Sequence, residues 1–465
     1  MKVLMLGWEY PPHVSGGLGT ACRGLTVALA QQGVEVDFVL PRLYGEEDAP
    51  HLRLIDASSP DLTARQGQGR LNFAELGITF HEVPALLAPY MTAEQYARVL
   101  ETLEQAVNNP VTSASEHPIA QLKAALAQAG VAAGPKLASI PLPVVDGPAD
   151  VAPRQVPQQY GGDLFAEVER YAARLLTGLS GEWQVIHAHD WMTFPAGIAL
   201  AQRTGVPLVV HVHSLEQDRS GGGGGNPRVI AIEQAGLAAA TRVIAVSHYT
   251  RNMIHKWHGI PLEKIDVVHN GVDMPNVIQA YRKETEWDGP VVLFLGRITL
   301  QKGPDYFVSA AAKVAKLVPD AIFVMAGVGD MLPQISSQVA RLGLQDRFHF
   351  PGFLNADEVE RMYSLADVYV MPSVSEPFGI TALEAMSYNK PVIVSRQSGV
   401  SELIRHALKA DFWDIDQLAN QIAAVLRYPE LRQAIIASAA DEVRRIHWQA
   451  AGERTLAVYR SLGVS

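Results

Sequence analysis

The first forty residues combine short apolar runs with one amphipathic segment. Residues 3–6 form an apolar run, a loop rich in glycine and proline follows, and apolar residues then recur at helical spacing from Leu18 to Leu29. Gly33 closes this helical segment, and residues 34–40 form a second apolar run. The order strand, loop, helix, strand predicts the start of a parallel doubly wound sheet, whose ligands bind at the carboxyl ends of the strands.

The periodic signal weakens between residues 41 and 162, where six prolines fall between Pro135 and Pro157. We interpret this segment as a variable insertion with helices near residues 93–107 and 119–129. Regular patterning returns with a predicted helix at residues 164–179. Three apolar strands follow, each ending in polar residues: 185–187 before His189-Asp190, 208–212 before His213-Ser214, and 242–246 before Ser247-His248.

A polar, proline-containing stretch at residues 274–290 separates this half from a second series of alternating strands and helices. Pro304 suits the first position of a helix, where its missing N–H would have no partner in any case. The strands of this series are predicted at residues 291–295, 322–326, 348–350, 368–371 and 392–394. Two Rossmann-like domains facing each other across a cleft are therefore predicted, at residues 1–275 and 290–445. Residues 441–462 are predicted to be helical, and the end of the chain, 446–465, could return to the first domain.

Composition limits the class of protein. The residues are 48% hydrophobic and 18% charged, a balance typical of globular proteins. With 465 residues, the chain is too long to form one ordinary hydrophobic core. A net charge of −10 disfavours binding to nucleic acid or anionic lipid through a general field. No apolar run approaches a membrane span, and Cys22 is the single cysteine, so no intrachain disulfide can form. We therefore expect a cytoplasmic protein.

Gly16-Gly17-Leu18-Gly19 stands between the first predicted strand and its helix. Bare backbone N–H groups at a helix N-terminus can hold a diphosphate, although the glycines could equally serve a tight turn. The pattern is not G-x-G-x-x-G, and no acidic residue follows the second strand where a ribose would need it. A nicotinamide enzyme is therefore disfavoured.

Two histidine pairs, His187/His189 and His211/His213, place their members two residues apart. In a strand this spacing points both side chains to one face, as in some metal sites, but no carboxylate or thiolate set with ligand spacing accompanies them in the sequence. We expect His189 and His213 to emerge from strand ends toward the cleft. His187 and His211 are then structural.

Arg297 and Lys302 lie in the sequence Gly-Arg-Ile-Thr-Leu-Gln-Lys-Gly, directly after a strong apolar strand. Two cations at the carboxyl end of a strand can neutralise a leaving diphosphate without a metal ion. A solvated basic loop would have the same sequence.

Glu376 and Glu384 are eight residues apart in Glu-Pro-Phe-Gly-Ile-Thr-Ala-Leu-Glu, across a predicted strand-to-helix turn. They can reach different parts of one ligand, and Gly379 leaves the helix N-terminus bare for a phosphate. The alternative gives Glu376 only a charge role at the helix start and leaves Glu384 facing solvent. Asp414-Ile415-Asp416 has the form of a metal-binding DxD, but Asp416 is predicted to be the N-cap of a helix instead.

Together these segments resemble the GT-B glycosyltransferases, specifically glycosyltransferase family 4 and the bacterial glycogen and starch synthases. The resemblance covers nearly the whole chain and weakens only at residues 41–162. Its most specific element is Glu376-x7-Glu384, which resembles the family's E-x7-E. It is supported by His189 in His-Asp-Trp and by Arg297 and Lys302.

The resemblance implies a role for each of these residues. His189, Arg297, Lys302 and Glu376 would be catalytic, with His189 binding the sugar, the two cations meeting the phosphates and Glu376 meeting the donor sugar. Donor binding would involve Gly16 and Gly17 together with Phe378, Gly379, Ile380 and, at the ribose, Glu384. Glu9, His213 and Ser214 are candidates for the acceptor side. No metal and no cofactor are expected.

The sequence also departs from the bacterial glycogen synthases. Val14 and Ser15 replace the lysine that precedes the glycine pair, and His213-Ser214 replaces His-Asn, so the donor base stays open. The opening Trp8-Glu9-Tyr10-Pro11-Pro12 still favours a glucan synthase. The resemblance implies retaining transfer of glucose from ADP-glucose or UDP-glucose to an α-glucan. Alternatives are a sucrose-like, trehalose-like or lipid-linked acceptor, a nucleotide-sugar epimerase, and a sugar-binding protein without activity.

Overall fold

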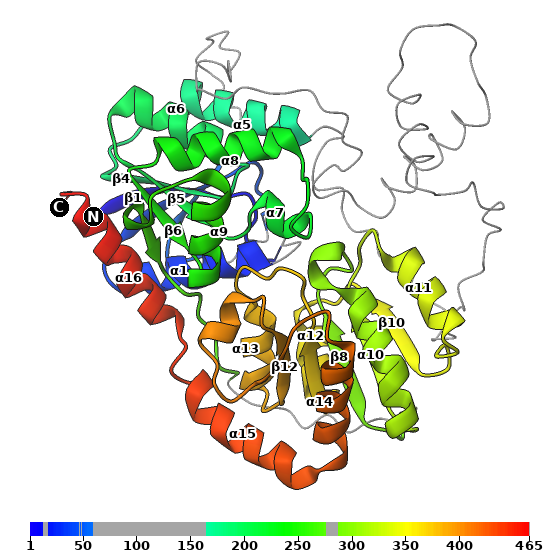
Figure 1. Ribbon diagram of the computed structural model, residues 1–465. Helices are drawn as coiled ribbons and strands as arrows, with labels where there is room; N and C mark the ends of the chain where they lie inside the picture. The colour runs from blue at the N-terminus through cyan, green and yellow to red at the C-terminus, as the bar shows by residue number, and fades with distance from the viewer. Residues whose placement is uncertain (13–16, 46, 48, 59–163, 276–286, 465) are drawn as a thin grey trace, which may run out of the picture. The chain divides into compact units, whose positions relative to one another are not determined.

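The computed structural model describes residues 1–12, 17–45, 47, 49–58, 164–275 and 287–464. Within these residues the strands form two parallel sheets, each covered by helices on both faces (Figure 1). Both sheets belong to the same compact unit of the chain. Among the described helices, none has the length and apolar character needed to cross a membrane. The predicted helices at 93–107 and 119–129 lie outside the described residues.

The first sheet has the strand order β3-β2-β1-β4-β5-β6-β7 among the described residues. Its strands are β1 (Lys2–Leu6), β2 (Glu35–Leu40), β3 (Arg53–Asp56), β4 (Val185–His189), β5 (Leu208–Val212), β6 (Arg242–Ala245) and β7 (Ile265–Val267). The central strands are short and rich in valine, isoleucine and leucine because both faces of a parallel sheet are buried. The register pairs Leu6 with Ala188 and His189 with His211, which brings the ends of β1, β4 and β5 to one edge.

Helices connect these strands on both faces. They are α1 (Gly17–Ala30), α5 (Leu164–Gly178), α6 (Phe194–Thr204), the short α7 (Glu216–Arg219), α8 (Pro227–Ala239) and α9 (His248–His258), with a 3₁₀ turn at Leu262–Lys264. Figure 1 shows α5, α6 and α8 on one side of the sheet and α1 on the other. Helix α9 contacts α8, where Nδ1 of His258 lies 3.1 Å from Oε1 of Gln234. Ser247 caps α9 by accepting a hydrogen bond from the Thr250 N–H.

The second sheet has the order β10-β9-β8-β11-β12-β13 within the described part of the chain. Its strands are β8 (Val291–Leu295), β9 (Ile322–Ala326), β10 (Phe348–Gly352), β11 (Val368–Met371), β12 (Val392–Ser395) and β13 (Leu408–Ala410). Its helices are α10 (Pro304–Leu317), α11 (Leu332–Arg341), α12 (Ala356–Leu365), α13 (Ile380–Ser387), α14 (Ile415–Arg427) and α15 (Pro429–Val443), with 3₁₀ turns at Leu300–Lys302 and Gly399–Glu402. Pro304 is the first residue of α10, as predicted. The reversal of strand order at β8 and β11 is a topological switch point, where doubly wound sheets bind ligands.

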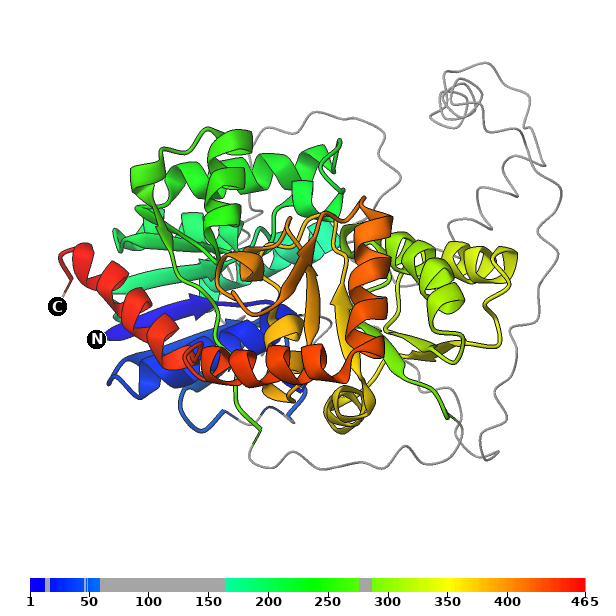
Figure 2. The ribbon, with the colours of Figure 1, turned by 60° about the horizontal axis from the view of Figure 1, so that its bottom comes forward.

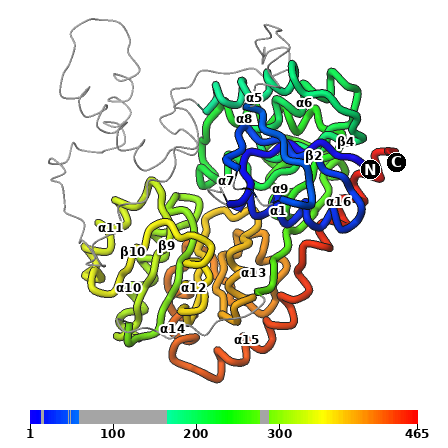
Figure 3. The backbone as a smooth tube through the Cα atoms, turned by 180° about the vertical axis from the view of Figure 1, so that it is seen from behind, coloured from blue at the N-terminus to red at the C-terminus, as the bar shows by residue number. Residues whose placement is uncertain are grey.

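The last helix, α16 (Trp448–Ser461), packs along α1 of the first sheet, as Figures 2 and 3 show from two sides. The Trp448 ring lies where a Cβ on Gly24 would stand, with 2.1 Å between them, so only glycine permits this contact. On the same helix, the Tyr459 hydroxyl is 2.6 Å from Nδ1 of His187. The end of the chain is therefore part of the first sheet's core.

Three local predictions were wrong. The single helix predicted at 441–462 is interrupted between α15 and α16, because the Ile446 carbonyl accepts a hydrogen bond from the Val272 N–H instead of continuing a helix. A strand, β3, forms inside the segment interpreted as an insertion. The N-cap of α14 is Asp414, which accepts from the Gln417 N–H, whereas Asp416 pairs with Lys313.

Candidate functional site

An ion pair stands at the carboxyl ends of the two central strands of the second sheet. The Lys302 Nζ donates to Oε2 of Glu376 at 2.6 Å, and the Ser373 hydroxyl donates to the same oxygen at 3.1 Å. Glu376 is buried, and Lys302 is largely buried beside it. Two residues 74 positions apart are thus joined at the switch point. A buried, hydrogen-bonded pair of this kind holds both charges in fixed positions.

Backbone contacts between the loops after β8 and β11 position this pair. The Val374 N–H donates to the Gln301 carbonyl at 2.9 Å, which ties one loop to the other. Gly303 has a φ of +64°, and a Cβ there would lie 2.2 Å from the Pro372 carbonyl oxygen. Glycine is therefore required directly after Lys302, both for its conformation and for the close approach.

The backbone around Glu376 is extended and anchored to the loop after β12. The Glu376 N–H donates to the Gln397 carbonyl, and the Gly399 N–H donates to the Glu376 carbonyl, each at 2.9 Å. These bonds form an isolated parallel bridge between Glu376 and Ser398. The carboxylate is consequently carried by a short piece of sheet rather than by an unsupported loop.

Glu376 leads directly into the N-terminus of α13. Gly379 is the N-cap, with a φ of +107°, and Ile380 begins the helix. Phe378 is buried, and its ring centroid lies 6.2 Å from that of His269. The bare N–H groups at the start of α13 form a site with partial positive charge, where an anion is favoured. The predicted donor-binding residues Phe378, Gly379 and Ile380 therefore stand together at one helix end.

Glu384 lies on the second turn of α13 and is half-buried. Its Oε2 accepts a hydrogen bond from the Tyr363 hydroxyl at 2.8 Å. Burial raises the pKa of the Glu384 carboxyl above its ordinary value, and the Tyr363 hydrogen bond opposes that rise. The alternative in which Glu384 faces solvent is wrong. The carboxylate is held in a defined direction by a phenol.

Arg297 lies in the same loop as Lys302, five residues earlier. Its Nη2 is 3.4 Å from Oε1 of Gln301, a long contact, and its charge also acts on the Asp330 carboxyl. Gln301 itself is buried, and its carbonyl receives the Val374 N–H. Both predicted phosphate cations are thus on the loop that follows β8.

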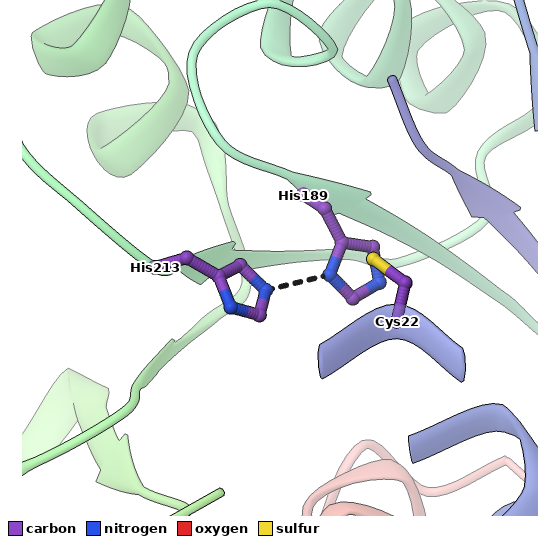
Figure 4. A group of neighbouring side chains, drawn as sticks. All are labelled: Cys22, His189 and His213. Carbon is purple, nitrogen blue, oxygen red and sulfur yellow. Dashed lines mark hydrogen bonds between the residues drawn. The ribbon is translucent and has the colours of Figure 1, made fainter. Parts of the chain in front are cut away.

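The carboxyl end of the first sheet is lined by four histidines on one face. The rings of His187 and His189 stack with centroids 4.3 Å apart, and those of His211 and His213 with centroids 4.2 Å apart. Nδ1 of His189 is 3.0 Å from Nε2 of His213, a hydrogen bond that joins the ends of β4 and β5 (Figure 4). His189 and His213 are therefore brought together, but the His189 side chain is fully buried, whereas the sequence predicts that it emerges from the strand end toward the cleft.

Burial keeps these imidazoles neutral near pH 7. Desolvation lowers the pKa of His187 and of His213 to about 3, and lowers the pKa of His189 and His211 well below 6.5. A ring in this cluster can accept or donate a hydrogen bond without carrying charge. His189 can accordingly bind a sugar hydroxyl as a neutral partner.

Asp190 fixes the end of β5 relative to β4. It adopts a φ of +57°, unusual for a residue other than glycine, and its Oδ1 accepts the His213 N–H at 2.7 Å. A longer contact of 3.4 Å joins the same oxygen to the Ser214 N–H. Burial raises the Asp190 pKa to about 7, although the Arg219 charge acts in the opposite direction. Strain of this kind at a strand end is typical of functional sites.

The remaining predicted residues of the first sheet surround this edge. Glu9 is buried, Ser214 is half-buried, and Gly17 is exposed at the start of α1. No heavy atom of the described residues lies within 4 Å of a Cβ built on Gly17. Gly16 lies outside the described residues.

Sequence reasoning missed a hydrogen-bonded chain next to Glu376. The Ser375 hydroxyl donates to Oδ1 of Asp218 at 2.5 Å, and the Tyr249 hydroxyl is 2.8 Å from Ser375 Oγ. Burial raises the pKa of the Asp218 carboxyl to about 6. The Pro377 carbonyl also accepts from Ser247 at 2.6 Å. No motif marks these residues, because their partners are more than a hundred positions away.

Comparisons with known proteins agree with this architecture. Three family models match successive parts of the chain: the starch synthase catalytic domain at residues 2–96, Glycosyltransferase Family 4 at 124–274, and Glycosyl transferases group 1 at 277–442. Among solved structures, sucrose-phosphate synthase from Thermosynechococcus elongatus superposes with a TM-score of 0.65 at 21% identity, covering 99% of this chain and 98% of that one. Anabaena HepE in complex with UDP-glucose gives 0.58 at 17% identity, covering 99% and 100%. At these identities the likeness shows the fold alone, which is that of the GT-B class.

Curated relatives extend the comparison to sequence. An uncharacterized glycosyltransferase of Methanocaldococcus jannaschii is 26% identical, covering 99% of this chain and 98% of its own. The glycogen synthase of Mycobacterium tuberculosis is 25% identical, covering 99% and 94%. The D-inositol 3-phosphate glycosyltransferase of an Arthrobacter strain is 30% identical, covering 68% and 79%. The chain belongs to the GT-B glycosyltransferases of the group 1 and family 4 type.

Proposed function

We propose that this glycosyltransferase moves glucose from a nucleotide diphosphate donor, ADP-glucose or UDP-glucose, to an α-glucan with retention of configuration. The glycogen synthase relative spans nearly the full length of both chains, and the starch synthase model matches residues 2–96, which include β1, β2 and β3 of the first sheet. The complex of Anabaena HepE with UDP-glucose supports a nucleotide-sugar donor. Retention comes from the family resemblance.

The observation that carries the proposal is the Lys302–Glu376 pair beside the N-terminus of α13. A departing nucleotide diphosphate gains negative charge as the glycosidic bond breaks. Arg297, Lys302 and the α13 N–H groups are charge-stabilising donors fixed in advance, so they favour the transition state over the ground state. Glu376, held by Lys302, then faces the sugar, while Glu384 on the next turn is assigned to the ribose.

The first sheet supplies the second half of the reaction in this proposal. The neutral His189 ring binds a sugar hydroxyl, and the start of α1 at Gly17 adds backbone donors toward the diphosphate. Glu9, His213 and Ser214 form the acceptor side. Binding donor and acceptor together in a water-poor cleft places the reacting atoms in a near-attack arrangement.

We further propose that the transfer needs no divalent metal, with Arg297 and Lys302 meeting the diphosphate charge instead. The test is donor turnover after exhaustive chelation. Unchanged turnover is expected. Loss of activity on chelation, with recovery on adding magnesium or manganese, would contradict this part of the proposal.

The acceptor is tested by supplying ADP-, UDP- and GDP-glucose labelled in the sugar to glycogen, maltose, fructose, fructose 6-phosphate and inositol 3-phosphate. We expect label in glycogen or lengthened maltose. A second candidate function, transfer to a small phosphorylated acceptor, is favoured by the D-inositol 3-phosphate relative and by the sucrose-phosphate synthase structure. Label in fructose 6-phosphate or inositol 3-phosphate products, with none in glucan, would select it. Conversion of the donor to another nucleotide sugar in the absence of an acceptor would indicate an epimerase. The absence of any donor turnover would indicate a binding protein.

A further inference from the structure

Cys22 joins the histidines at the carboxyl end of the first sheet. Its Sγ and one ring nitrogen of each of His189 and His213 lie within 4.8 Å of one another. Figure 4 shows the sulfur of Cys22, from α1, beside the His189 ring, with His213 on the other side of that ring. Three side chains from α1, β4 and the end of β5 thus converge on one position.

The donor set and its spacing suit a soft divalent cation. The three ligand atoms are at most 4.8 Å apart. A point at the centre of three atoms 4.8 Å apart is about 2.8 Å from each of them, so a central cation would lie no farther than this from any ligand atom. Zinc binds sulfur at about 2.3 Å and imidazole nitrogen at about 2.0–2.1 Å, so movements of the ligand atoms by at most about 0.5–0.8 Å complete the geometry. The His189–His213 separation of 3.0 Å is already close to that of two ligands on one tetrahedral ion.

An aspartate beside the cluster positions one of its members. Asp190 accepts the His213 N–H at 2.7 Å, so it fixes the backbone of one ligand. An outer carboxylate that orients a ligand is a common component of metal sites.

We propose that Cys22, His189 and His213 bind one soft divalent cation such as Zn²⁺, with a fourth position left open. When the cation is bound, His189 can no longer bind the sugar, so the cation inhibits the transferase. The inhibition rests on the proposed function, whereas the binding of the cation is independent of it. The site is inhibitory and is separate from the metal-independent transfer. Three protein ligands with an open fourth position are typical of catalytic zinc sites.

The site is tested by titrating metal-free full-length protein with Co²⁺, using a phosphine as reductant. We expect one equivalent to give tetrahedral d–d bands and a thiolate-to-cobalt charge-transfer band, which Zn²⁺ displaces. Because Cys22 is the chain's single cysteine, the charge-transfer band can arise only from Cys22. The wild-type spectrum therefore shows by itself whether Cys22 binds the metal, even if the variants fold poorly. Binding without the band, or no binding, overturns the proposal.

Variants separate this site from its neighbours. Cys22→Ser should abolish the charge-transfer band. His213→Gln should weaken Co²⁺ binding at least about tenfold, because loss of an outer-shell partner already lowers metal affinity by about that factor and loss of a ligand should lower it at least as much. His269→Gln is the matched control, because it disrupts the other mixed cluster, His248, His269 and Glu402, and should leave the band unchanged. A band that survives His213→Gln at full affinity, or is lost in His269→Gln, overturns the assignment of ligands.

Inhibition is measured separately, as the ratio of donor turnover with and without Zn²⁺. The ratio should fall in wild type, recover on chelation, and respond to Zn²⁺ at least about tenfold less sensitively in Cys22→Ser. A cobalt band together with turnover that Zn²⁺ does not affect overturns the inhibitory role. If no donor or acceptor supports turnover, the proposed function fails while the cobalt spectrum still decides the metal site.

Discussion

The carboxyl ends of the two sheets differ in their chemistry, although both sheets are parallel and covered by helices on both faces. The first end holds four stacked imidazoles, three of them buried and that of His213 partly buried, whose pKa values are lowered. The second holds a cation and an anion in direct contact, Lys302 and Glu376. Neutral groups suit a sugar, whose hydroxyls need hydrogen bonds, whereas fixed charges suit a diphosphate. The comparison assigns recognition of uncharged groups to one sheet and charge stabilisation to the other.

The largest expected effect tests the charged end. Lys302→Ala should lower donor turnover by roughly a hundredfold to a thousandfold, about 2.7–4 kcal/mol, as removal of one preorganised donor does. It also leaves the Glu376 carboxylate buried without its cation, so the free energy of unfolding should fall. Adding Glu376→Gln should restore stability and leave turnover low. Normal turnover in Lys302→Ala would remove the charge-stabilising role.

The paired glutamates sharpen the division within that end. Glu376→Gln should lower kcat about a hundredfold with little change in KM, because its charge matters as the sugar reacts. Glu384→Gln should raise the KM for donor about tenfold or more and spare kcat, the size expected for one hydrogen bond to a charged group. Tyr363→Phe is the matched control, since it removes the partner of Glu384 and keeps the carboxylate. Equal effects of both glutamate changes on KM, with kcat unaffected, would refute the assignment.

The buried histidines of the first sheet should make the free energy of unfolding fall at acid pH. The pKa of His187 is about 3 in the folded protein and about 6.5 in the unfolded chain. A group with a depressed folded-state pKa contributes stability that is present above pH 6.5 and is lost as the pH falls toward 3. Asp190 and Asp218, with pKa values raised to about 7 and about 6, have the opposite sign and lose stabilisation as the pH rises through 4 to 7.

Because four histidines shift downward and two aspartates upward, the net effect is lower stability at pH 5 than at pH 7. Denaturant unfolding at several pH values measures it. In His187→Gln the slope of unfolding free energy against pH between 5 and 6.5 should fall by about 1.4 kcal/mol per pH unit, one proton's worth. Tyr459→Phe, which removes only the partner of His187, should keep the slope. Identical slopes in wild type and His187→Gln would show that His187 is not a buried neutral group.

The smallest effect concerns the backbone beneath the charged end. Gly379→Ala should lower the free energy of unfolding by about 1 kcal/mol more than Gly343→Ala, the matched control. Both glycines have positive φ, but a Cβ on Gly379 would lie 2.9 Å from the Met371 methyl, whereas one on Gly343 meets no described atom within 4 Å. Urea unfolding compares the two. An equal loss would mean that the Met371 side chain moves aside freely.

The sequence predicted the architecture well because hydrophobic periodicity is local. Apolar runs marked β1, β5, β8 and β11 closely, and strand ends marked where Lys302 and Glu376 stand. Their direct contact was not predictable, since it depends on β8 pairing with β11 across 74 residues. The interruption before α16 was missed for a similar reason: residues 441–447 contain neither glycine nor proline, and a distant carbonyl partner ends the helix.

In the part of the chain that the structure describes, two segments connect the sheets, and they are in contact with each other. The first runs through Gly271 and Val272, the second through Ile446 and His447, and the Val272 N–H donates to the Ile446 carbonyl at 3.1 Å. A Cβ on Gly271 would lie 2.3 Å from the Trp448 nitrogen, so the two strands of chain are in close contact there. A single connecting segment would allow the two sheets to rotate about several axes. Two connecting segments that are hydrogen-bonded to each other form one hinge, so a change of angle between the sheets must bend both segments at the same place.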